Sequence, residues 1–465
     1  MFNKEVYQKR RSELSKSINN GIILLLGNVD SPMNYPGNIY EFRQDSTFLY
    51  FFGLDHPGYA AIIDIDENEN YIFGDDIDID DIIWMGPQPS IKDKASEIGV
   101  DKVKPFKNLF DYIKSAQNNG RKIHFLPPYR PENKLLLQDL TGIKANETKA
   151  NASLELIKAV VKLRSIKGSE EIDHIEKIMD IGYEMHTTSM KMAHEGIYER
   201  EIAGTIEGIA LKYGGRISFP VILSRRGETL HNHDHSNLLK NGDLLLTDAG
   251  FESSMHYATD NTRTFPVGGK FSQKQREIYE IVLATNNAVH KAVKPGIFYK
   301  DVHTLAAKTI FDGLKNLGLT RGNTDEAVAA GAHALFMPHG LGHMMGLDVH
   351  DMEDLGENIV GYEDNQKRSE QFGTAYLRLA RELKPGFVLT DEPGIYFIPA
   401  LIDKWINEKI NNQYINFEKV NQYRDFGGIR LEDDILVTTD GGRNLGRRRI
   451  PITIDEVEEM IRSGK

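Results

Sequence analysis

The residues best suited to chemistry lie in the sequence MPHGLGHMMGLDVHD, between Met337 and Asp351. It contains three histidines separated by glycines, namely His339, His343 and His350. Pro338 and the glycines disfavour a helix, because proline and glycine are the poorest residues for a helix interior. A backbone rich in glycine lets other groups approach closely, so we expect the histidines to project from an extended or looped segment into a site. The alternative is a histidine-rich surface loop, and acidic residues elsewhere decide between the two.

Four strand-like runs supply acids that would complete such a site. They are LLLTDAG, ATDNTRTFP, FVLTDEPG and GIRLEDDILV, which contain Asp248, Asp260, Glu392 and Glu432 respectively. Alternation along the last run places Arg430 on the same face as Glu432. Each acid taken alone would be interpreted as a carboxylate at a strand end or on the surface. Their joint occurrence with the histidine segment favours a shared site.

Four carboxylates brought together would need cations, because neighbouring carboxylates repel and cannot all stay ionised. Two divalent cations would bring the charge of the four acids and a neutral His343 to zero. In such sites the ions lie about 3.5–4 Å apart and share bridging ligands. Oxygen ligands with one imidazole favour manganese, or cobalt in vitro, and do not exclude zinc. The chain has no cysteine, so thiolate ligands and thiolate nucleophiles are excluded.

The bulk composition excludes several classes of protein. A length of 465 residues predicts two or three domains. The 68 acidic and 56 basic residues give a net charge of −12, which disfavours nucleic acid as a partner because phosphate binding needs a basic surface. The first residues are charged and lack the apolar run of a signal peptide, and the longest early apolar run is too short to cross a bilayer. We therefore expect a cytoplasmic protein without a membrane partner.

The first third of the chain alternates short apolar strands with helices, and we find no catalytic constellation there. The strands are predicted at Ile22–Leu26, Ala60–Ile65 and Lys122–Leu126, and helices at Lys4–Ile18 and Asn108–Ala116. The acidic run from Asp75 to Asp81 lacks the glycine and the terminal glutamate of a calcium loop, which predicts a solvated edge or loop.

A change to charged, amphipathic helical sequence near Lys162–Ile175 predicts a domain boundary, with domains at residues 1–165 and 166–465. Helices are predicted at Tyr198–Tyr213 and, with a turn at Pro295-Gly296, within Ser272–Leu317. Residues 353–383 and 402–423 are interpreted as insertions between strands, and the triplet at 447–449 as a surface cluster of arginines. The whole chain is predicted to be α/β.

The acid and histidine motifs together resemble those of the pita-bread metallopeptidases, the aminopeptidase P, prolidase and creatinase group. The motifs are DAG, D-x-T-R-T-F-P, HGLGH with LDVHD, DEPG and GIRLEDD, in that order. The resemblance covers nearly all of residues 169–461, and FRQDSTFLYFFGLDHPG at 42–58 resembles the N-terminal domain of aminopeptidase P and prolidase. It implies a smaller N-terminal α/β domain followed by a pita-bread catalytic domain with a curved, mostly antiparallel sheet.

The resemblance also implies a role for each residue. Asp248 would bind one metal ion, His343 and Glu392 the other, and Asp260 and Glu432 would bridge both. Glu392 would accept and pass on a proton, and His350 with His339 would stabilise charge on the carbonyl oxygen. His231 and Arg430 are assigned to substrate binding, with Arg430 also supporting Glu432. The implied reaction is metal-assisted hydrolysis of the peptide bond before proline.

The sequence departs from the family pattern at three places. Asp391 stands before Glu392 where the family commonly has an apolar residue, which would bring an extra charge near the site. Among the histidines of HNHDH, we expect His231 to bind substrate and His233 and His235 to lie on the surface. One extra residue between Asp248 and Asp260 predicts a longer hairpin turn.

Two activities and one inactive alternative fit the motifs. We favour an Xaa-Pro aminopeptidase acting on proline-containing peptides, because the N-terminal motifs resemble bacterial aminopeptidase P. FGTAYLRLARELKPGF and the insertion after Ile402 resemble animal prolidases, so a dipeptidase is the alternative. A binding module that has lost its metal ligands, and creatinase, are disfavoured because every ligand position is intact. The resemblance further implies a homodimer or homotetramer.

Overall fold

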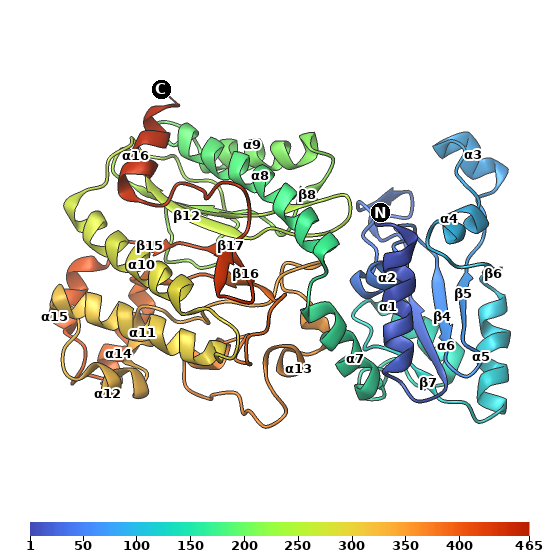
Figure 1. The fold of residues 1–465 in the computed structure, drawn as a ribbon. Helices are drawn as coiled ribbons and strands as arrows, with labels where there is room; N and C mark the ends of the chain where they lie inside the picture. The colour runs from blue at the N-terminus through green and yellow to red at the C-terminus, as the bar shows by residue number, and fades with distance from the viewer. Residues whose placement is uncertain (465) are drawn as a thin grey trace. The chain divides into compact units, whose positions relative to one another are not determined.

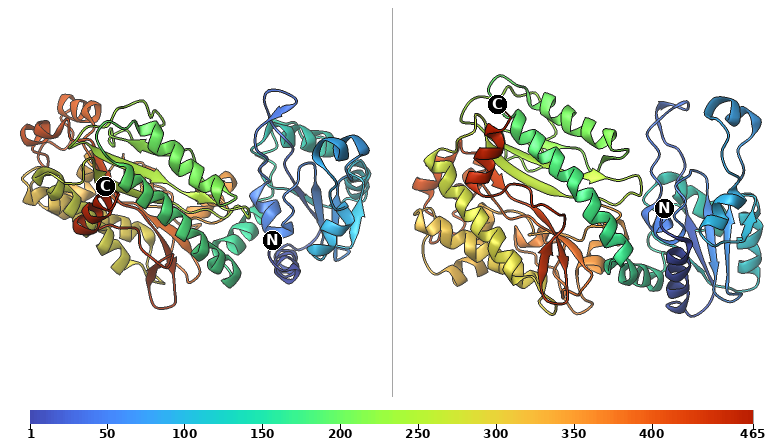
Figure 2. Two further views of the ribbon diagram at one scale, coloured as in Figure 1. Left: turned by 90° about the horizontal axis from the view of Figure 1, so that it is seen from above. Right: turned by 45° about the horizontal axis from the view of Figure 1, so that its top comes forward.

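The computed structural model describes residues 1–464 and divides into two compact units. The N-terminal unit comprises residues 1–164 with 354–356, and the C-terminal unit comprises residues 165–353 with 357 to the C-terminus. Figures 1 and 2 draw the ribbon of each unit. Both units mix helices with strands, so the predicted α/β class is confirmed.

The N-terminal unit contains a mixed five-stranded sheet in the order β6-β5-β4-β1-β7. β1 runs antiparallel to β4, with Leu24 opposite Ile62, and parallel to β7. Leu109 and Leu137 pack on these apolar strands. The strands of this unit are β1 Ile22–Leu26, β2 Pro32–Tyr35, β3 Asn38–Ile39, β4 Ala60–Asp64, β5 Glu69–Phe73, β6 Lys102–Lys104 and β7 Ile123–His124. Its helices are α1 Lys4–Lys16, α2 Ser46–Phe52, α3 Ile79–Met85, α4 Ile91–Glu97, α5 Asn108–Asn118, α6 Pro131–Thr141 and α7 Leu154–Ser165, whose last residue enters the next unit.

The C-terminal unit contains short antiparallel sheets, of which the two largest have the orders β12-β10-β9 and β13-β16-β17. The pairs β14-β15 and β11-β8 complete the pattern. The strands are β8 Arg216–Ile217, β9 Ile222–Ser224, β10 Leu244–Ala249, β11 Phe251–Glu252, β12 Asn261–Pro266, β13 Val388–Asp391, β14 Gly394–Tyr396, β15 Gly428–Arg430, β16 Asp433–Val437 and β17 Gly442–Asn444. Strands β8 to β12 belong to the first half of this unit, and strands β13 to β17 belong to the second half. An isolated bridge between Thr262 and Glu432 joins the strands of the two halves.

Two helix pairs flank these strands, α8 with α9 and α10 with α11 (Figure 1). Their bounds are α8 Ser169–Met192, α9 Glu199–Lys212, α10 Gln273–Ala292 and α11 Tyr299–Asn316. Each pair turns at a glycine with positive φ, 87° at Gly196 and 83° at Gly296, where glycine avoids the strain of a side chain. The sequences Gly-Ile-Tyr and Gly-Ile-Phe begin at these glycines, so the two halves share a local design.

The remaining helices lie in and around the predicted insertions. Residues 353–383 form the 3-10 turns η2 Glu353–Leu355 and η3 Thr374–Tyr376 with α13 Glu357–Gly361 between them. Residues 402–423 form most of α14 Pro399–Asn407, α15 Phe417–Val420 and η4 Asn421–Tyr423. The others are α12 Thr324–Ala329, η1 Ala332–Leu335 and α16 Ile454–Arg462. None of the helices formed by the described residues is long and apolar enough to cross a membrane.

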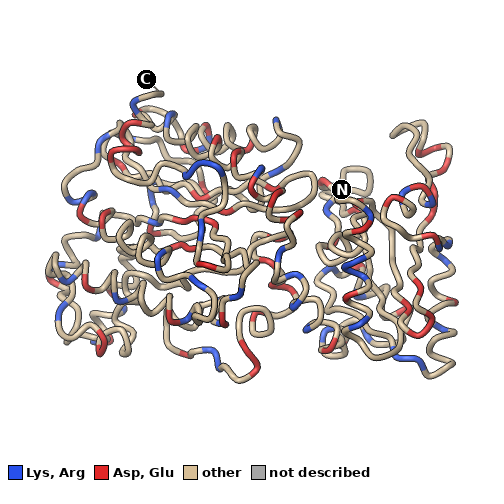
Figure 3. The backbone as a smooth tube through the Cα atoms, viewed as in Figure 1, with Lys and Arg blue, Asp and Glu red and all other residues tan. Residues whose placement is uncertain are grey.

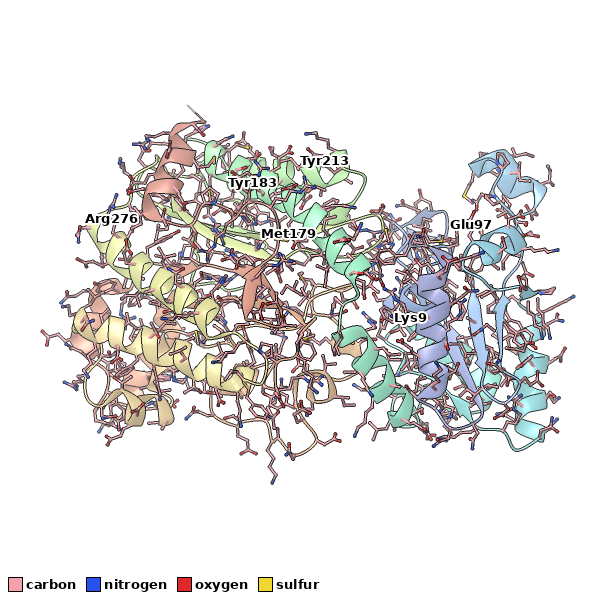
Figure 4. All side chains as sticks on the ribbon, in the orientation of Figure 1. Lys9, Glu97, Met179, Tyr183, Tyr213 and Arg276 are labelled. Carbon is pink, nitrogen blue, oxygen red and sulfur yellow. The ribbon has the colours of Figure 1, made fainter. Side chains whose placement is uncertain are left out.

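Of two surface predictions, one needs correction and one is confirmed. The acidic run is only partly a loop, because Asp78 caps α3 and accepts a hydrogen bond from the backbone N–H of Asp81 at 2.9 Å. The arginine triplet is exposed, as predicted, and two of its members also make specific contacts. Arg449 pairs with the buried Asp433 at 2.7 Å, and the Arg448 guanidinium lies 4.0 Å from the ring centre of Tyr183, a residue of α8 labelled in Figure 4.

Candidate metal centre and substrate pocket

The C-terminal unit contains a cavity of about 520 Å³ lined by nearly all the residues singled out in the sequence. The side chains brought to it are those of Asp248, Asp260, His343, Glu392, Glu432, His231, His339, His350 and Arg430. Figure 3 marks the acidic residues in red along the backbone of this unit. The segments that supply these side chains are far apart in sequence, so tertiary folding creates the site.

The first two carboxylates come from the hairpin formed by β10 and β12. Asp248 lies opposite Thr262 in the antiparallel register, and Asp260 immediately precedes β12. The backbone N–H of Asp260 donates to the Asp434 carboxylate at 3.0 Å, which fixes Asp260 from the neighbouring half. Between the two acids the chain turns at His256, which adopts a φ of 65° and whose ring lies 2.7 Å from Glu252.

The other ligands are placed by β13 and by the link between β15 and β16. Glu392 follows β13 directly, where Pro393 ends the strand. The same strand holds His343, because the Thr390 N–H donates to the His343 carbonyl at 3.0 Å and the His343 N–H donates to the Thr390 hydroxyl at 3.1 Å. Glu432 is held against β12, where its N–H donates to the Thr262 carbonyl at 3.0 Å.

Three of these side chains present ligand atoms within 4.8 Å of one another, those of Asp260, His343 and Glu432. The His343 Nε2 lies 3.3 Å from Asp260 and 4.0 Å from Glu392. Its Nδ1–H donates to the Met344 carbonyl at 3.1 Å, so Nε2 carries the lone pair that a metal ion requires. Burial lowers the pKa of His343 to about 4, which keeps the ring neutral near pH 7.

The carboxylates in the cavity need positive charge. Burial, together with the charge of Asp248, raises the pKa of Asp260. Burial raises the pKa of Glu392 to about 8, and it raises that of Glu432 well above its ordinary value, with Asp260 adding to both shifts. The Oδ1 atom of Asp248 is buried and has no hydrogen-bond partner among the described residues. Carboxyl groups with raised pKa values, together with an unpaired carboxylate oxygen, are what a site for divalent cations would show in the absence of the cations.

Arg430 lies within the wall of the cavity and pairs with Asp248, not directly with Glu432 as the sequence suggested. Its Nη2 is 2.5 Å from the Asp248 carboxylate, and its Nε donates to the Thr262 hydroxyl at 3.0 Å. That hydroxyl in turn donates to Glu432 at 2.6 Å. Arg430 therefore orients one acid directly and the other through Thr262.

His339 is held at both ring nitrogens. Its Nδ1–H donates to the Gly340 carbonyl at 2.7 Å, so its Nε2, 3.0 Å from the Tyr396 hydroxyl, accepts that hydrogen bond. Arg430 donates to the same hydroxyl oxygen at 3.0 Å. His339 can therefore donate to a substrate oxygen only if this arrangement changes.

His350 has one nitrogen left for a ligand. Its Nδ1 lies 2.5 Å from the Glu353 carboxylate, and its ring centre lies 4.2 Å from that of His343. Because the carboxylate accepts from Nδ1–H, Nε2 is the nitrogen available to a substrate. Glu353 was not predicted from the sequence, since only its spacing of three residues from His350 could have indicated it.

The sequence also did not predict most of the cavity wall. The cavity has an apolar side formed by Phe219, Pro220, Ile222, Leu230 and Val349, and a polar side that includes Tyr376 and Arg378. His233, expected on the surface, is exposed but also lines the cavity beside His231. His235 is half-buried, and its Nδ1–H donates to the Leu223 carbonyl at 2.9 Å. Asp391 is fully buried and, unlike Glu392, is absent from the cavity lining.

Comparison with known proteins identifies the family to which this chain belongs. The model of metallopeptidase family M24 matches residues 173–439, more than half of the chain. The chain belongs to this family. The model of the aminopeptidase P N-terminal domain matches residues 7–124. These matches confirm the resemblance inferred from the motifs.

Relatives of both predicted activities are similar over nearly the whole chain. The human Xaa-Pro dipeptidase is 31% identical over 448 residues, which cover 95% of this chain and 88% of the relative. A probable Xaa-Pro aminopeptidase of Fusarium vanettenii is 33% identical over 445 residues, covering 95% and 92%. The structure of Escherichia coli aminopeptidase P matches with a TM-score of 0.81 at 28% identity and covers 100% of this chain and 99% of that chain. The two-domain pita-bread architecture is thus confirmed, and an M24 metallopeptidase implies divalent metal ions.

Proposed function

We propose that the chain is an exopeptidase that uses two divalent metal ions to hydrolyse the bond between a first residue and a following proline. The convergence of four acids and His343 on one cavity carries this proposal. Asp248 would bind one ion, His343 and Glu392 the other, and Asp260 and Glu432 would bridge them. The ligand atoms of Asp260, His343 and Glu432 lie within 4.8 Å of one another, which supports the position of the ion that His343 would bind.

Manganese is the metal ion that we favour for this site. Three kinds of evidence in the chain favour this ion: the ligands are mostly carboxylate oxygens, one imidazole joins them, and cysteine is absent. When bound, the ions would lower the pKa of a water molecule so that it can attack a peptide carbonyl near neutral pH, and would polarise that carbonyl.

The side chains of the cavity would divide the remaining work. Glu392 would take a proton from the attacking water and pass it to the departing proline nitrogen. His350, through Nε2, would donate to the carbonyl oxygen as charge develops on it. His231 would contact the substrate beside this group. The apolar wall of Phe219, Ile222 and Leu230 would accept the proline ring.

Peptides longer than two residues are the favoured substrates, in line with the likeness to the Fusarium relative and to Escherichia coli aminopeptidase P. One observation favours a dipeptidase instead. Arg378 lines the cavity with its Nε 3.5 Å from Glu353, and a cation in this place would pair with the free carboxylate of a dipeptide. The human dipeptidase relative supports this second candidate.

Hydrolysis of Gly-Pro and of a longer peptide beginning Arg-Pro-Pro, measured after chelation and addition of Mn²⁺, tests both candidates. We expect release of the first residue from the long peptide. Activity confined to Gly-Pro would make the protein a dipeptidase, and Arg378→Gln would then lower kcat/KM for that dipeptide by at least about tenfold. If neither peptide is cleaved while Mn²⁺ is bound, the Xaa-Pro proposal is wrong.

A further inference from the structure

The two strands that carry Glu392 and Glu432 bear a second pair of acids next to them in sequence. Asp391 precedes Glu392 and Asp433 follows Glu432, and Asp391 lies opposite Asp433 in the antiparallel register of β13 and β16. Because side chains alternate along a strand, Asp391 points away from the cavity that Glu392 lines. Both aspartates are buried, at 0% and 4% exposure. Two like charges directly opposite one another destabilise a sheet unless other groups separate or neutralise them.

Helix α10 supplies those groups from one face. Asn286 and His290 are four residues apart on this helix, so their side chains lie on the same side. The Asn286 Nδ2 donates to Asp391 at 3.1 Å and to Asp433 at 3.4 Å. The His290 Nε2 lies 3.3 Å from Asp391 and 3.7 Å from Asp433. Each of the two helix residues therefore contacts both aspartates.

Two arginines complete the cluster on the side of Asp433. Arg263 and Arg449 reach Asp433 at 2.6 Å and 2.7 Å. Arg449 also donates to the Asn286 Oδ1 at 2.6 Å, which turns the amide nitrogen of Asn286 toward the two carboxylates. No arginine or lysine is paired with Asp391 in the part of the chain that the structure describes, so its contacts are the ones made by Asn286 and His290.

We propose that Asn286 and His290 are positioning residues that set the separation of the metal ligands Glu392 and Glu432. Each helix residue joins the two strands at the positions adjacent to the ligands, on the face opposite the cavity. A change in this contact would shift both ligand carboxylates relative to each other. The proposal rests on the proposed metal site but not on the choice of peptide substrate.

Titration of metal-free protein with Mn²⁺, followed by calorimetry, tests the proposal with the whole chain. His290→Leu removes the contact to both aspartates, and we expect the dissociation constant for Mn²⁺ to rise at least about tenfold, as for other residues that orient metal ligands. His290→Gln can still donate to Asp391, and we expect it to stay within about threefold of the parent. At saturating Mn²⁺, His290→Leu should lower kcat with little change in KM, because the cavity wall is untouched.

Glu458→Gln is the matched control. Glu458 is also buried and paired with two cations, Lys270 and Arg276 at 2.5 Å each, but it lies on α16 and contacts no metal ligand. Figure 4 labels Arg276 near the start of α10. This variant should lower the melting temperature and leave Mn²⁺ affinity unchanged.

Asn286→Ser provides a milder second variant should His290→Leu fail to fold, and it should weaken Mn²⁺ binding severalfold. The proposal is overturned if the folded variants lose thermal stability but bind Mn²⁺ as the parent does, since that result assigns Asn286 and His290 a purely structural role. Mn²⁺ binding is read independently of peptide cleavage. A parent that binds Mn²⁺ but cleaves no Xaa-Pro peptide would therefore overturn the proposed function and leave the positioning proposal intact.

Discussion

The two halves of the C-terminal unit both present carboxylates to the cavity, but different contacts support those carboxylates. In the first half, α8 lies behind β10, where the His186 Nε2–H donates to the Ala249 carbonyl at 3.0 Å and the Ser189 and Thr247 hydroxyls are 3.0 Å apart. In the second half, α10 lies behind β13 and β16, where Asn286 and His290 contact two carboxylates. One half is supported by neutral hydrogen bonds and the other by a charged cluster.

Equivalent positions in the two halves therefore have different roles. His186 and Asn286 each stand ten residues before the glycine that turns their helix pair. A neutral hydrogen bond to a backbone carbonyl stabilises the fold locally and contributes about 1 kcal/mol. A bridge between two buried carboxylates joins two strands, because leaving either charge unpaired is costly. We therefore expect loss of the α8 contacts in the first half to reduce stability, and loss of the α10 contacts in the second half to reduce metal binding.

The largest effect should come from removing one proposed bridging ligand in each half. Asp260→Asn and Glu432→Gln keep the shape of the side chain but remove its charge. Both should reduce peptide hydrolysis in Mn²⁺ by more than about 100-fold, since residues that only orient ligands already contribute 10–100-fold. Parallel assays with circular dichroism check this. A large loss in only one of the two variants would show that the halves do not share the metal ions equally.

The charge of the cavity predicts how the metal-free protein responds to pH. Burial raises the pKa of Glu392 to about 8, and that of Glu432 is raised as well, so the folded state holds protons that the unfolded state releases near pH 4.5. Their contribution to stability is complete below about pH 4.5 and is lost as the pH rises through about 8. Buried histidines such as His339, whose pKa falls to about 3, act in the opposite direction only below about pH 6.5.

We therefore expect the melting temperature of chelated protein to fall between pH 6.5 and 8.5. Saturating Mn²⁺ should reduce this fall, because the ions bind the ionised carboxylates. Scanning calorimetry across this range, with and without Mn²⁺, makes the measurement. A melting temperature that rises with pH in the chelated protein would contradict the protonation assigned to these acids.

His186→Leu separates the two kinds of support directly. The substitution leaves the buried Ala249 carbonyl without its 3.0 Å partner, which should lower the free energy of unfolding by about 1–3 kcal/mol. Because His186 contacts a backbone carbonyl of one strand and does not join two carboxylates on different strands, Mn²⁺ affinity should stay within about threefold of the parent. Denaturant unfolding and calorimetric titration give the two values. If His186→Leu weakened Mn²⁺ binding more than His290→Leu does, the roles assigned to the two helices would be wrong.

The smallest effects should come from the two turns, where the halves are alike. Gly196→Ala and Gly296→Ala each place a side chain at a positive φ, and a Cβ would meet no atom closer than 4.0 Å at either position. The cost is therefore conformational, about 1–2 kcal/mol at each site. Equal losses in urea unfolding are expected. Losses that differ by more than about 1 kcal/mol would show that the turns are under different tertiary constraints.

The strand and helix pattern of this chain could be predicted because its signals are local. β1 is found at the predicted Ile22–Leu26, and the helices on either side of Pro295-Gly296 are α10 and α11. The set of acids and histidines that line the cavity could be predicted because its motifs are specific to a family. Alternation along strands also predicts that Asp391 and Glu392 point to opposite faces, but the partners of Asp391 could not be predicted, because they lie on a helix about 100 residues earlier.

What the sequence did not provide were partners chosen by tertiary packing. Arg430 pairs with Asp248 across 182 residues, and nothing in either segment indicates that distance. The apolar wall at Phe219 and Leu230 belongs to ordinary-looking loop sequence, and His233 resembles its surface neighbours. Such contacts depend on how separately formed elements meet, which periodicity and spacing do not encode.

The long sequence separation between Asp260 and Glu432 affects how the chain folds. Asp260 and Glu432 meet through a bridge between residues 262 and 432, so the site is incomplete until β16 has joined β12. Contacts of this range form slowly, because the loop between them must be closed before they are made. A metal ion that binds only the assembled state would then stabilise the contact between residues 262 and 432. Newly synthesised protein would pass through an interval in which it is collapsed but cannot retain metal, and during that interval it is most exposed to proteolysis.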